Sequence, residues 1–326
     1  MTTPDLSDLL ATARVVALPL HTRFRGVETR EALLFEGPEG WAEFSPFVEY
    51  EDAEAATWLA AAIDFGWRPQ PTPLRDGIRV NATVPAVDVA RVPGVLARFA
   101  GCRTAKVKVA EPGQTLADDM ARVRAVRDAM GPEGRVRVDA NGAWNVDEAE
   151  HAVHALVEFD LEYVEQPCAT VTELAELRTR VKYLGIPVAA DESVRKSSDP
   201  LAVARAGAAD LLVVKAQPLG GVTHALQIIA AAGLPAVVSS ALDTAIGLSQ
   251  GAALAAALPE LDFDCGLGTA SLFLDDVADR RPRDGILPAE RATPEAAALD
   301  RLAAPEDRRD WWLARLERCH RVLAER

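Results

Sequence analysis

Short apolar runs alternate with amphipathic segments along most of the chain, beginning near residue 78. The runs are rich in β-branched and other apolar residues, and alanine- and leucine-rich segments with helical periodicity lie between them, as at 147–158, 172–184 and 222–232. Because the two kinds of segment alternate roughly every 25–30 residues, the pattern predicts a parallel sheet. Eight such units predict an α/β fold with a closed (β/α)8-type barrel. The predicted strands cover residues 78–84, 104–109, 135–139, 161–165, 187–190, 210–215, 236–240 and 261–265.

The two ends of the chain follow different patterns. Before the barrel, residues 15–20 and 32–36 have the pattern of strands, and residues 53–64 have the pattern of a helix. After it, residues 308–325 place tryptophan and leucine on one face of a helical repeat. An α+β segment is therefore predicted before the barrel, and an amphipathic helix is predicted to close the chain.

Composition and charge exclude several classes of protein. The 326 residues are 49% hydrophobic, which is enough to bury a barrel core and a smaller domain, and the formal net charge is −14. That charge disfavours binding to nucleic acids or anionic membranes, and no apolar run reaches the roughly 18 residues of a membrane helix. The acidic start is a poor signal peptide, and the four cysteines form no CxxC pair. We therefore expect a cytoplasmic protein without disulfides or a zinc site.

Lysine is rare in this chain and is therefore informative. Only five of the 35 Lys and Arg residues are lysines, and two of them, Lys106 and Lys108, lie in one predicted strand. Strand side chains alternate, so both ammonium groups point to the same face of an otherwise apolar element. Burying them costs free energy unless nearby groups balance or use their charge. Lysine, unlike arginine, can also lose its proton readily.

Acidic residues stand at or just beyond the carboxyl ends of three further predicted strands. Asp139, Glu165 and Asp191 follow one another at nearly regular separations, with Lys108 before them and Lys215 after them. The carboxyl ends of barrel strands meet at one mouth, so these side chains are expected to converge. One such residue alone is usually a helix cap or a solvated loop residue, whereas five on consecutive predicted strands indicate a site. Converging carboxylates repel one another, and without histidine or thiolate beside them they favour Mg²⁺, or alternatively Mn²⁺.

The segments at these strand ends resemble motifs of the enolase superfamily. They are KVK at 106–108, DANGAW at 139–144, VEQP at 164–167, ADES at 190–193 and VVKAQPLGG at 213–221. Lysines on both the second and the sixth strand resemble the muconate-lactonizing-enzyme subgroup, and within it the chain most resembles the o-succinylbenzoate synthase family. The resemblance implies a capping domain over residues 1–76, a barrel over 77–270, and a C-terminal segment over 271–326 that returns to the cap.

The resemblance also implies a role for each charged residue. Asp139, Glu165 and Asp191 are expected to bind the metal ion. Lys108 is expected to be the catalytic base, with a pKa lowered by neighbouring cations, and Lys215 to stabilise the enolate as a cation from the opposite side. Glu192 is expected to accept a hydrogen bond from a lysine without binding the metal. Contacts to a small carboxylate substrate are expected from Lys106, Arg137, Asn141, Ser239, Ser240, Gly266 and Gly268.

The implied reaction is a metal-assisted syn dehydration. A base removes the proton α to a carboxylate of 2-succinyl-6-hydroxy-2,4-cyclohexadiene-1-carboxylate, and loss of hydroxide gives 2-succinylbenzoate, a step of menaquinone biosynthesis. Three alternatives remain open: an N-succinylamino acid racemase or dipeptide epimerase with Lys108 and Lys215 as opposed bases, a Schiff-base aldolase built on Lys215, and a non-catalytic metal-binding barrel. A mandelate-racemase type of site is disfavoured because no histidine lies between His224 and His320. The sequence leaves open whether the protein is a monomer or a homo-oligomer.

Overall fold

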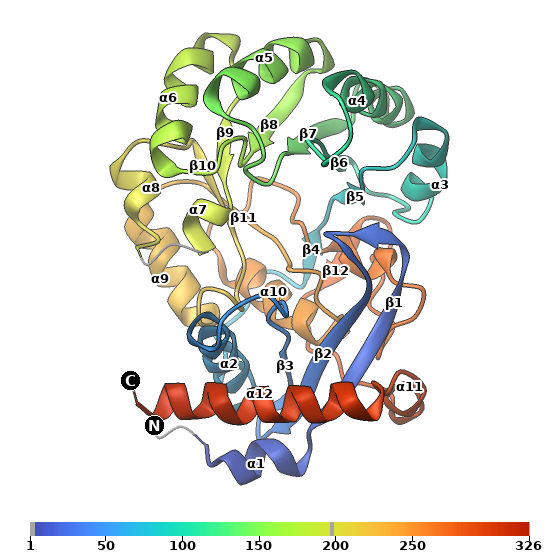
Figure 1. Ribbon diagram of the computed structural model, residues 1–326, viewed down its shortest axis with the longest axis vertical. Coiled ribbons are helices and arrows are strands. Elements are labelled where there is room, and N and C mark those ends of the chain that lie inside the picture. Colours follow the sequence, from blue (N-terminus) through green and yellow to red (C-terminus); the bar gives the residue numbers. More distant parts are fainter. Residues whose placement is uncertain (1–3, 196–198, 326) are drawn as a thin grey trace.

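A curled parallel sheet lies at the centre of the protein, and helices surround it (Figure 1). The computed structural model describes residues 4–195 and 199–325. Within these residues, seven strands follow chain order across the sheet, as expected where crossover connections join each parallel strand to the next. The strands are β5 (Ala82–Val84), β6 (Thr104–Lys108), β7 (Arg135–Asp139), β8 (Leu161–Glu165), β9 (Val188–Ala190), β10 (Leu211–Val214) and β11 (Ala236–Val238).

The eighth predicted strand, residues 261–265, is not a full strand in the structure. Two isolated parallel bridges stand in its place: Cys265 pairs with Val80 beside the first barrel strand, and Gly266 pairs with Ser239 beyond the last. A Cβ atom at Gly266 would lie 2.4 Å from Ser239 Oγ and 3.0 Å from Ser239 Cβ, so glycine favours this close approach. The predicted barrel is confirmed, and these bridges join the two edges of its sheet.

The helices predicted at 147–158, 172–184 and 222–232 are confirmed as α5, α6 and α9. Helices α4, α5 and α6 each begin with a capping box, in which an N-cap side chain and an acidic side chain exchange hydrogen bonds with the backbone. These local signals explain why the helices begin where they do. The outer helices are α3 (Val92–Leu96), α4 (Leu116–Met130), α5 (Val146–Leu156), α6 (Val171–Val181), α7 (Glu192–Arg195), α8 (Ala202–Arg205), α9 (Val222–Ala232) and α10 (Ala245–Ala257).

The first predicted strand, residues 78–84, is divided between two sheets. Strand β5 lies in the barrel, whereas β4 (Gly77–Arg79) pairs antiparallel with β12 (Ile286–Pro288). The hydrophobic pattern is continuous over this stretch, but the partner of β4 lies far along the chain. A local pattern cannot reveal that pairing, so the single predicted strand is corrected to two.

A smaller capping domain lies against the barrel (Figure 1). Its antiparallel sheet packs with α2 and α12 around a core that includes Phe44, Trp58 and Trp312. Helix α12 crosses α2, so the C-terminal segment returns to the cap as the resemblance implied. Strand β3 was not predicted, because its five-residue sequence GWAEF includes glycine, alanine and glutamate, which are depleted in strands. The elements are α1 (Leu6–Ala11), β1 (Arg14–Phe24), β2 (Val27–Gly37), β3 (Gly40–Phe44), α2 (Asp52–Trp67), α11 (Ala296–Arg301) and α12 (Glu306–Ala324).

Two further expectations concern the boundaries of the domains and the membrane. We keep as a proposal the division into residues 1–76, 77–270 and 271–326. Among the helices of the described residues, none combines the length and the apolar character needed to cross a bilayer.

Candidate active site

Lys106 and Lys108 of β6 lie beside Asp139 of β7 and Glu165 of β8. Lys108 is the register partner of Asp139, and Asp139 is the register partner of Glu165, so three neighbouring strands end at one level. Lys108 Nζ lies 2.5 Å from Asp139 Oδ2 and donates to Asn141 Oδ1 at 2.7 Å. Lys106 Nζ lies 2.9 Å from Glu165 Oε1 and 3.2 Å from Asp139 Oδ2. The fold therefore brings both lysines against two of the predicted acids.

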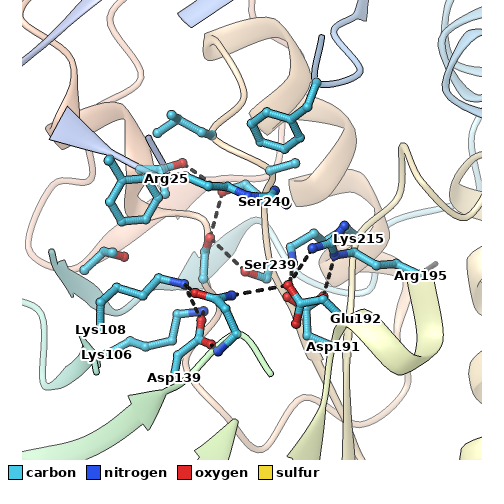
Figure 2. Close-up of a pocket in the computed structure, with 18 residues that line it drawn as sticks. Arg25, Lys106, Lys108, Asp139, Asp191, Glu192, Arg195, Lys215, Ser239 and Ser240 are labelled. Carbon is cyan, nitrogen blue, oxygen red and sulfur yellow. Dashed lines mark hydrogen bonds and ion pairs between the residues drawn. The ribbon is translucent and has the colours of Figure 1, made fainter. Parts of the chain in front are cut away.

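Asp191 and Lys215 form a second group across the pocket. Asp191 follows β9 and Lys215 follows β10, and the Lys215 ammonium donates to Asp191 Oδ2. Arg195 Nε donates to the other oxygen, Asp191 Oδ1, at 3.1 Å. Figure 2 shows this group on one side of the pocket and the group from β6 and β7 on the other. The two lysines to which catalysis was assigned, Lys108 and Lys215, thus stand on opposite sides.

Burial and charge shift the pKa values of the three acids in different directions. Burial, with the negative charge of Asp139 added, raises the pKa of Glu165 to about 7. Burial alone would raise the pKa of Asp139, but the ammonium groups of Lys108 and Lys106 outweigh it and hold that pKa well below its usual range. Neighbouring cations likewise outweigh burial at Asp191 and lower its pKa to about 2.

Two of the site lysines also have shifted pKa values. Burial would lower the pKa of Lys106, but the negative charges of Glu165 and Asp139 outweigh burial and raise it well above its usual value. At Lys215, burial outweighs the attraction of Asp191 and lowers the pKa. Lys106 therefore holds its proton more firmly than an exposed lysine would, and Lys215 holds its proton less firmly.

The donor atoms of the three acids suit a hard divalent cation. Among the described residues, no three His, Cys, Asp or Glu side chains already form a metal-binding group, and lysine ammonium groups lie against the acids. Glu165 is fully buried, and its Oε2 atom has no hydrogen-bond partner within the described part of the chain. A buried carboxylate oxygen without a partner is costly, and a cation would satisfy it. An all-oxygen donor set of this kind fits Mg²⁺ or Mn²⁺ better than zinc.

Most of the predicted site residues line one pocket beneath the cap (Figure 2). Ser240 Oγ donates to Gly266 O at 3.0 Å and lies 2.8 Å from Thr269 Oγ1. The substrate contacts predicted for the serines remain predictions, and the two side chains belong to the wall on which those contacts would form. The predicted residues in the lining are Lys106, Lys108, Asp139, Asn141, Asp191, Glu192, Lys215, Ser239, Ser240 and Gly266.

Three predicted site residues are not part of this lining: Glu165, which is fully buried against Lys106, and Arg137 and Gly268. The Arg137 guanidinium is fully buried, donates to Glu162 Oε2 at 2.8 Å and to Tyr163 Oη at 2.9 Å, and accounts for none of the pocket wall. A Cβ atom at Gly268 would lie 2.7 Å from Asn81 O, so this glycine is needed for packing against the backbone. The geometry therefore favours structural roles for Arg137 and Gly268 in place of the predicted substrate contacts.

Glu192 joins the two sides of the pocket. Its Oε1 atom accepts from Asn141 Nδ2 at 3.2 Å and from Arg195 Nη2 at 2.5 Å. We expected a lysine as its donor, but the described hydrogen bonds to Glu192 come from an amide and a guanidinium. Asn141 in turn accepts from Lys108, so a continuous polar chain links the two halves of the site.

Gln166 is a supporting residue that sequence reasoning missed. Its side-chain oxygen accepts from the backbone N–H of Asp191 at 2.9 Å and from that of Ser193 at 3.2 Å. Its amide nitrogen donates to Cys168 O at 2.8 Å and to Ser193 Oγ at 2.7 Å. The signal was present in the VEQP segment, where an amide directly follows a predicted metal ligand.

The capping domain also contributes residues to the pocket. The motifs at the ends of the barrel strands did not indicate these residues. Phe24 and Arg25, where β1 turns toward β2, and Phe47, which follows β3, line the pocket. Arg25 donates to Tyr50 Oη at 3.1 Å, and its guanidinium carbon lies 4.0 Å from the centre of the Phe47 ring. These residues meet the barrel only through long-range packing, which the sequence pattern does not encode.

Comparison with family models supports the architecture and the motifs together. Residues 89–291 match the model described as Enolase C-terminal domain-like, and residues 15–66 match Enolase N-terminal domain-like. Curated o-succinylbenzoate synthases from Mycolicibacterium smegmatis and Mycobacterium marinum are 58% and 57% identical to this chain. The matches cover 98% and 100% of this chain and 98% and 97% of those proteins.

The chain belongs to the enolase superfamily and, within it, to the o-succinylbenzoate synthase family. Solved structures agree with this fold. The muconate lactonizing enzyme of Pseudomonas putida superimposes with a TM-score of 0.72 at 20% identity, covering 90% of this chain and 98% of that one. The N-succinyl Arg/Lys racemase of Bacillus cereus superimposes with a TM-score of 0.74 at 17% identity, covering 90% and 97%. At these identities the structural likeness establishes the fold alone, and the family assignment follows from the curated relatives.

Proposed function

We propose that this protein is an o-succinylbenzoate synthase, which dehydrates 2-succinyl-6-hydroxy-2,4-cyclohexadiene-1-carboxylate to 2-succinylbenzoate. Curated relatives of that name, 56–58% identical over nearly the whole chain, support the proposal. The observation that carries it is the contact of Lys108 with Asp139 at the ends of two paired barrel strands. This contact puts a lysine that can act as a base beside a residue that can bind a metal ion.

The metal ion would be held by Asp139, Glu165 and Asp191. When bound, Mg²⁺ or Mn²⁺ neutralises part of the negative charge that develops on the substrate carboxylate as its α-proton leaves. Lys106, held as a cation by the negative charges of Glu165 and Asp139, attracts the same carboxylate and orients the ring above Lys108. The buried position of these groups excludes water and strengthens their attraction for the carboxylate.

Lys108 performs both proton transfers in this proposal. As a neutral amine it takes the α-proton, and the C–H electron pair becomes part of an enediolate. The C–O bond at the neighbouring ring carbon then breaks, and the departing hydroxide takes the proton back from Lys108 to give water. One base on one face of the ring makes the elimination syn. Aromatisation of the ring makes the overall step strongly favourable.

Lys215 faces the opposite side of the ring. The Lys215 ammonium donates a hydrogen bond to Asp191 across the pocket from Lys108, and Figure 2 shows the two amines apart. In the dehydration, Lys215 stays protonated and stabilises the enediolate electrostatically. Its ammonium group therefore acts without gaining or losing a proton.

A second activity is favoured by the same opposition of Lys108 and Lys215. Two amines on opposite faces of one α-carbon suit the racemisation of N-succinylamino acids or the epimerisation of dipeptides, in which one lysine removes a proton and the other returns one. Incubation with each enantiomer of an N-succinylamino acid in D₂O tests this activity. Deuterium at the α-carbon of both enantiomers would support it, and no exchange would exclude it.

The primary experiment measures formation of 2-succinylbenzoate directly. Purified protein is freed of metal with EDTA and assayed with the cyclohexadiene substrate before and after Mg²⁺ is restored. The proposal expects product with Mg²⁺ and little without it. Full activity in EDTA would contradict the metal's role, and product in neither condition would contradict the proposed function.

The cellular role belongs to the same proposal. The reaction is a step of menaquinone biosynthesis, which we place in the cytoplasm. All four cysteines are free in the structure, which agrees with a reducing compartment. Deletion of the gene should abolish menaquinone, and supplied 2-succinylbenzoate should restore it.

A further inference from the structure

The loop after β11 has a strained backbone where it meets the pocket. Ser239, Ser240, Ala241 and Leu242 all line the pocket, and Leu242 has a φ angle of +63°. A left-handed backbone costs a residue with a Cβ atom roughly 1–2 kcal/mol, so neighbouring groups must hold Leu242 in this conformation. The groups that do so come from the cap.

Arg30 of β2 holds two parts of the pocket wall with one guanidinium. Arg30 is only 3% exposed, and its Nε donates to Leu242 O at 3.1 Å. Its Nη2 donates to Ser45 O, and its guanidinium carbon lies 4.5 Å from the centre of the Phe47 ring. Phe47, like Leu242, lines the pocket. One planar group therefore packs against an apolar side chain of the cap and holds a backbone carbonyl of the barrel loop.

Glu43 of β3 holds the far end of the same loop. Its buried Oε2 accepts from the backbone N–H of Thr244 at 3.1 Å and from that of Gly247 at 2.9 Å, at the N-terminus of α10. Its Oε1 accepts from Ser45 Oγ at 2.5 Å. A carboxylate at a helix N-terminus is stabilised by the unpaired N–H groups there. A Cβ atom at Gly247 would lie 2.7 Å from Glu43 Oε2, so the glycine admits the carboxylate.

We propose that Arg30 and Glu43 are positioning residues that fix the apolar wall formed by Phe47 and Leu242, and so determine how tightly the substrate ring is bound. Neither side chain is part of the pocket lining, so both act through the residues they hold. The wall is formed by apolar side chains and not by the acids or lysines to which metal binding and proton transfer are assigned. Disturbing it is therefore expected to weaken substrate binding more than it slows proton transfer. The kinetic part of this inference rests on the proposed function.

The test compares Arg30→Lys and Glu43→Gln with a matched control. Arg280 is also buried and donates to two backbone carbonyls, those of Pro288 and Glu290, but it lies outside the pocket lining, so Arg280→Lys is the control. For each variant, KM and kcat are measured per folded molecule, with the folded fraction taken from circular dichroism. Arg30→Lys keeps the charge and loses the fork that reaches both carbonyls. Its KM should rise about tenfold, as expected for the loss of a buried hydrogen bond, with kcat within about threefold of the parent.

Amide hydrogen exchange supplies a readout that does not need the reaction. Exchange at Thr244 and Gly247 should become faster in Glu43→Gln than in the parent protein, and should stay unchanged in Arg280→Lys. Should Arg30→Lys fail to fold, Glu43→Gln provides both measurements.

Three outcomes are decisive. Raised KM with faster exchange in this loop supports the inference. Unchanged KM in a folded Arg30→Lys or Glu43→Gln variant, or equal changes in Arg280→Lys, overturns it. If the parent protein forms no 2-succinylbenzoate, the proposed function fails, and unchanged exchange would then separately overturn the positioning role.

Discussion

Lys108 Nζ lies 2.5 Å from Asp139 Oδ2, across two paired strands that end at the same level. This contact joins the residue proposed as base to a residue proposed as metal ligand. It also shows how a barrel makes a reactive site from ordinary strands, since register places side chains from separate segments within hydrogen-bond reach.

Replacing Lys108 with arginine should abolish proton transfer. Arginine keeps the positive charge but stays protonated at working pH, so it cannot act as a base. The rate of 2-succinylbenzoate formation should fall by about 10²–10⁴-fold or more. Lys182→Arg, at an exposed lysine after α6, is the matched control and should keep its activity. Activity of Lys108→Arg within tenfold of the parent would rule out Lys108 as the base.

Removing the Gln166 amide should weaken metal binding. Gln166→Leu leaves the backbone N–H groups of Asp191 and Ser193 without their acceptor, which costs about 1–3 kcal/mol for each buried group. Because Asp191 is then less well held, the Mg²⁺ concentration for half-maximal activity should rise by about 10–100-fold. The control is Gln250→Leu in α10. This variant also loses a buried side-chain amide, one that donates to Ala61 O. Equal loss of metal affinity in both variants would contradict a specific role for Gln166.

Replacing Arg137 should destabilise the barrel without changing substrate affinity. Arg137→Met removes the fully buried partner of Glu162, which keeps only its longer contact with Arg135, so the loss should approach the roughly 3–5 kcal/mol of a broken buried pair. Urea unfolding should therefore show a large loss of stability, while KM per folded molecule stays at the parent value. A raised KM with unchanged stability would instead support the predicted contact between Arg137 and the substrate.

Asp243 should make stability depend on pH. Burial, with the charge of Glu43 added, raises the pKa of Asp243 to about 7 in the folded protein, whereas an unfolded aspartate titrates near about 4. Between these values the folded state holds a proton that the unfolded state has lost. The free energy of unfolding therefore falls as pH rises from about 4 to about 7.

Asp243→Asn removes this titration and keeps an acceptor for the Ala241 N–H. The difference in urea midpoint between the variant and the parent should shift in favour of the variant from pH 5 to pH 7.5. Asp300→Asn, on an exposed position of α11, should follow the parent at both pH values. A constant difference between Asp243→Asn and the parent would contradict the raised pKa.

The barrel and the charged strand ends could be predicted because their signals are local. Each strand is a short apolar run, and a charged residue that ends such a run stands out from its neighbours. Asp139 and Glu165 were found in this way, and both end strands of the sheet.

The sequence could not predict how deep each side chain lies in the barrel, or which distant segments contact one another. Arg137 shares a face of β7 with Asp139, but two residues along a strand correspond to about 6.6 Å, which places its guanidinium among Glu162 and Tyr163. The alternation of side chains along a strand predicts which face of the sheet a residue points to, but not how deep in the barrel its side chain lies. Phe47 and Leu242 reach the pocket only through packing of the cap on the barrel, a relationship with no local signature.

The most direct test of the site is a crystal structure of the protein grown with Mn²⁺, measured for anomalous scattering. We expect one strong anomalous peak in contact with Asp139, Glu165 and Asp191, with Lys108 and Lys215 on opposite sides of it. An absent peak, or a peak bound elsewhere while Lys106 and Lys108 keep their contacts with the acids, would contradict the proposed metal site.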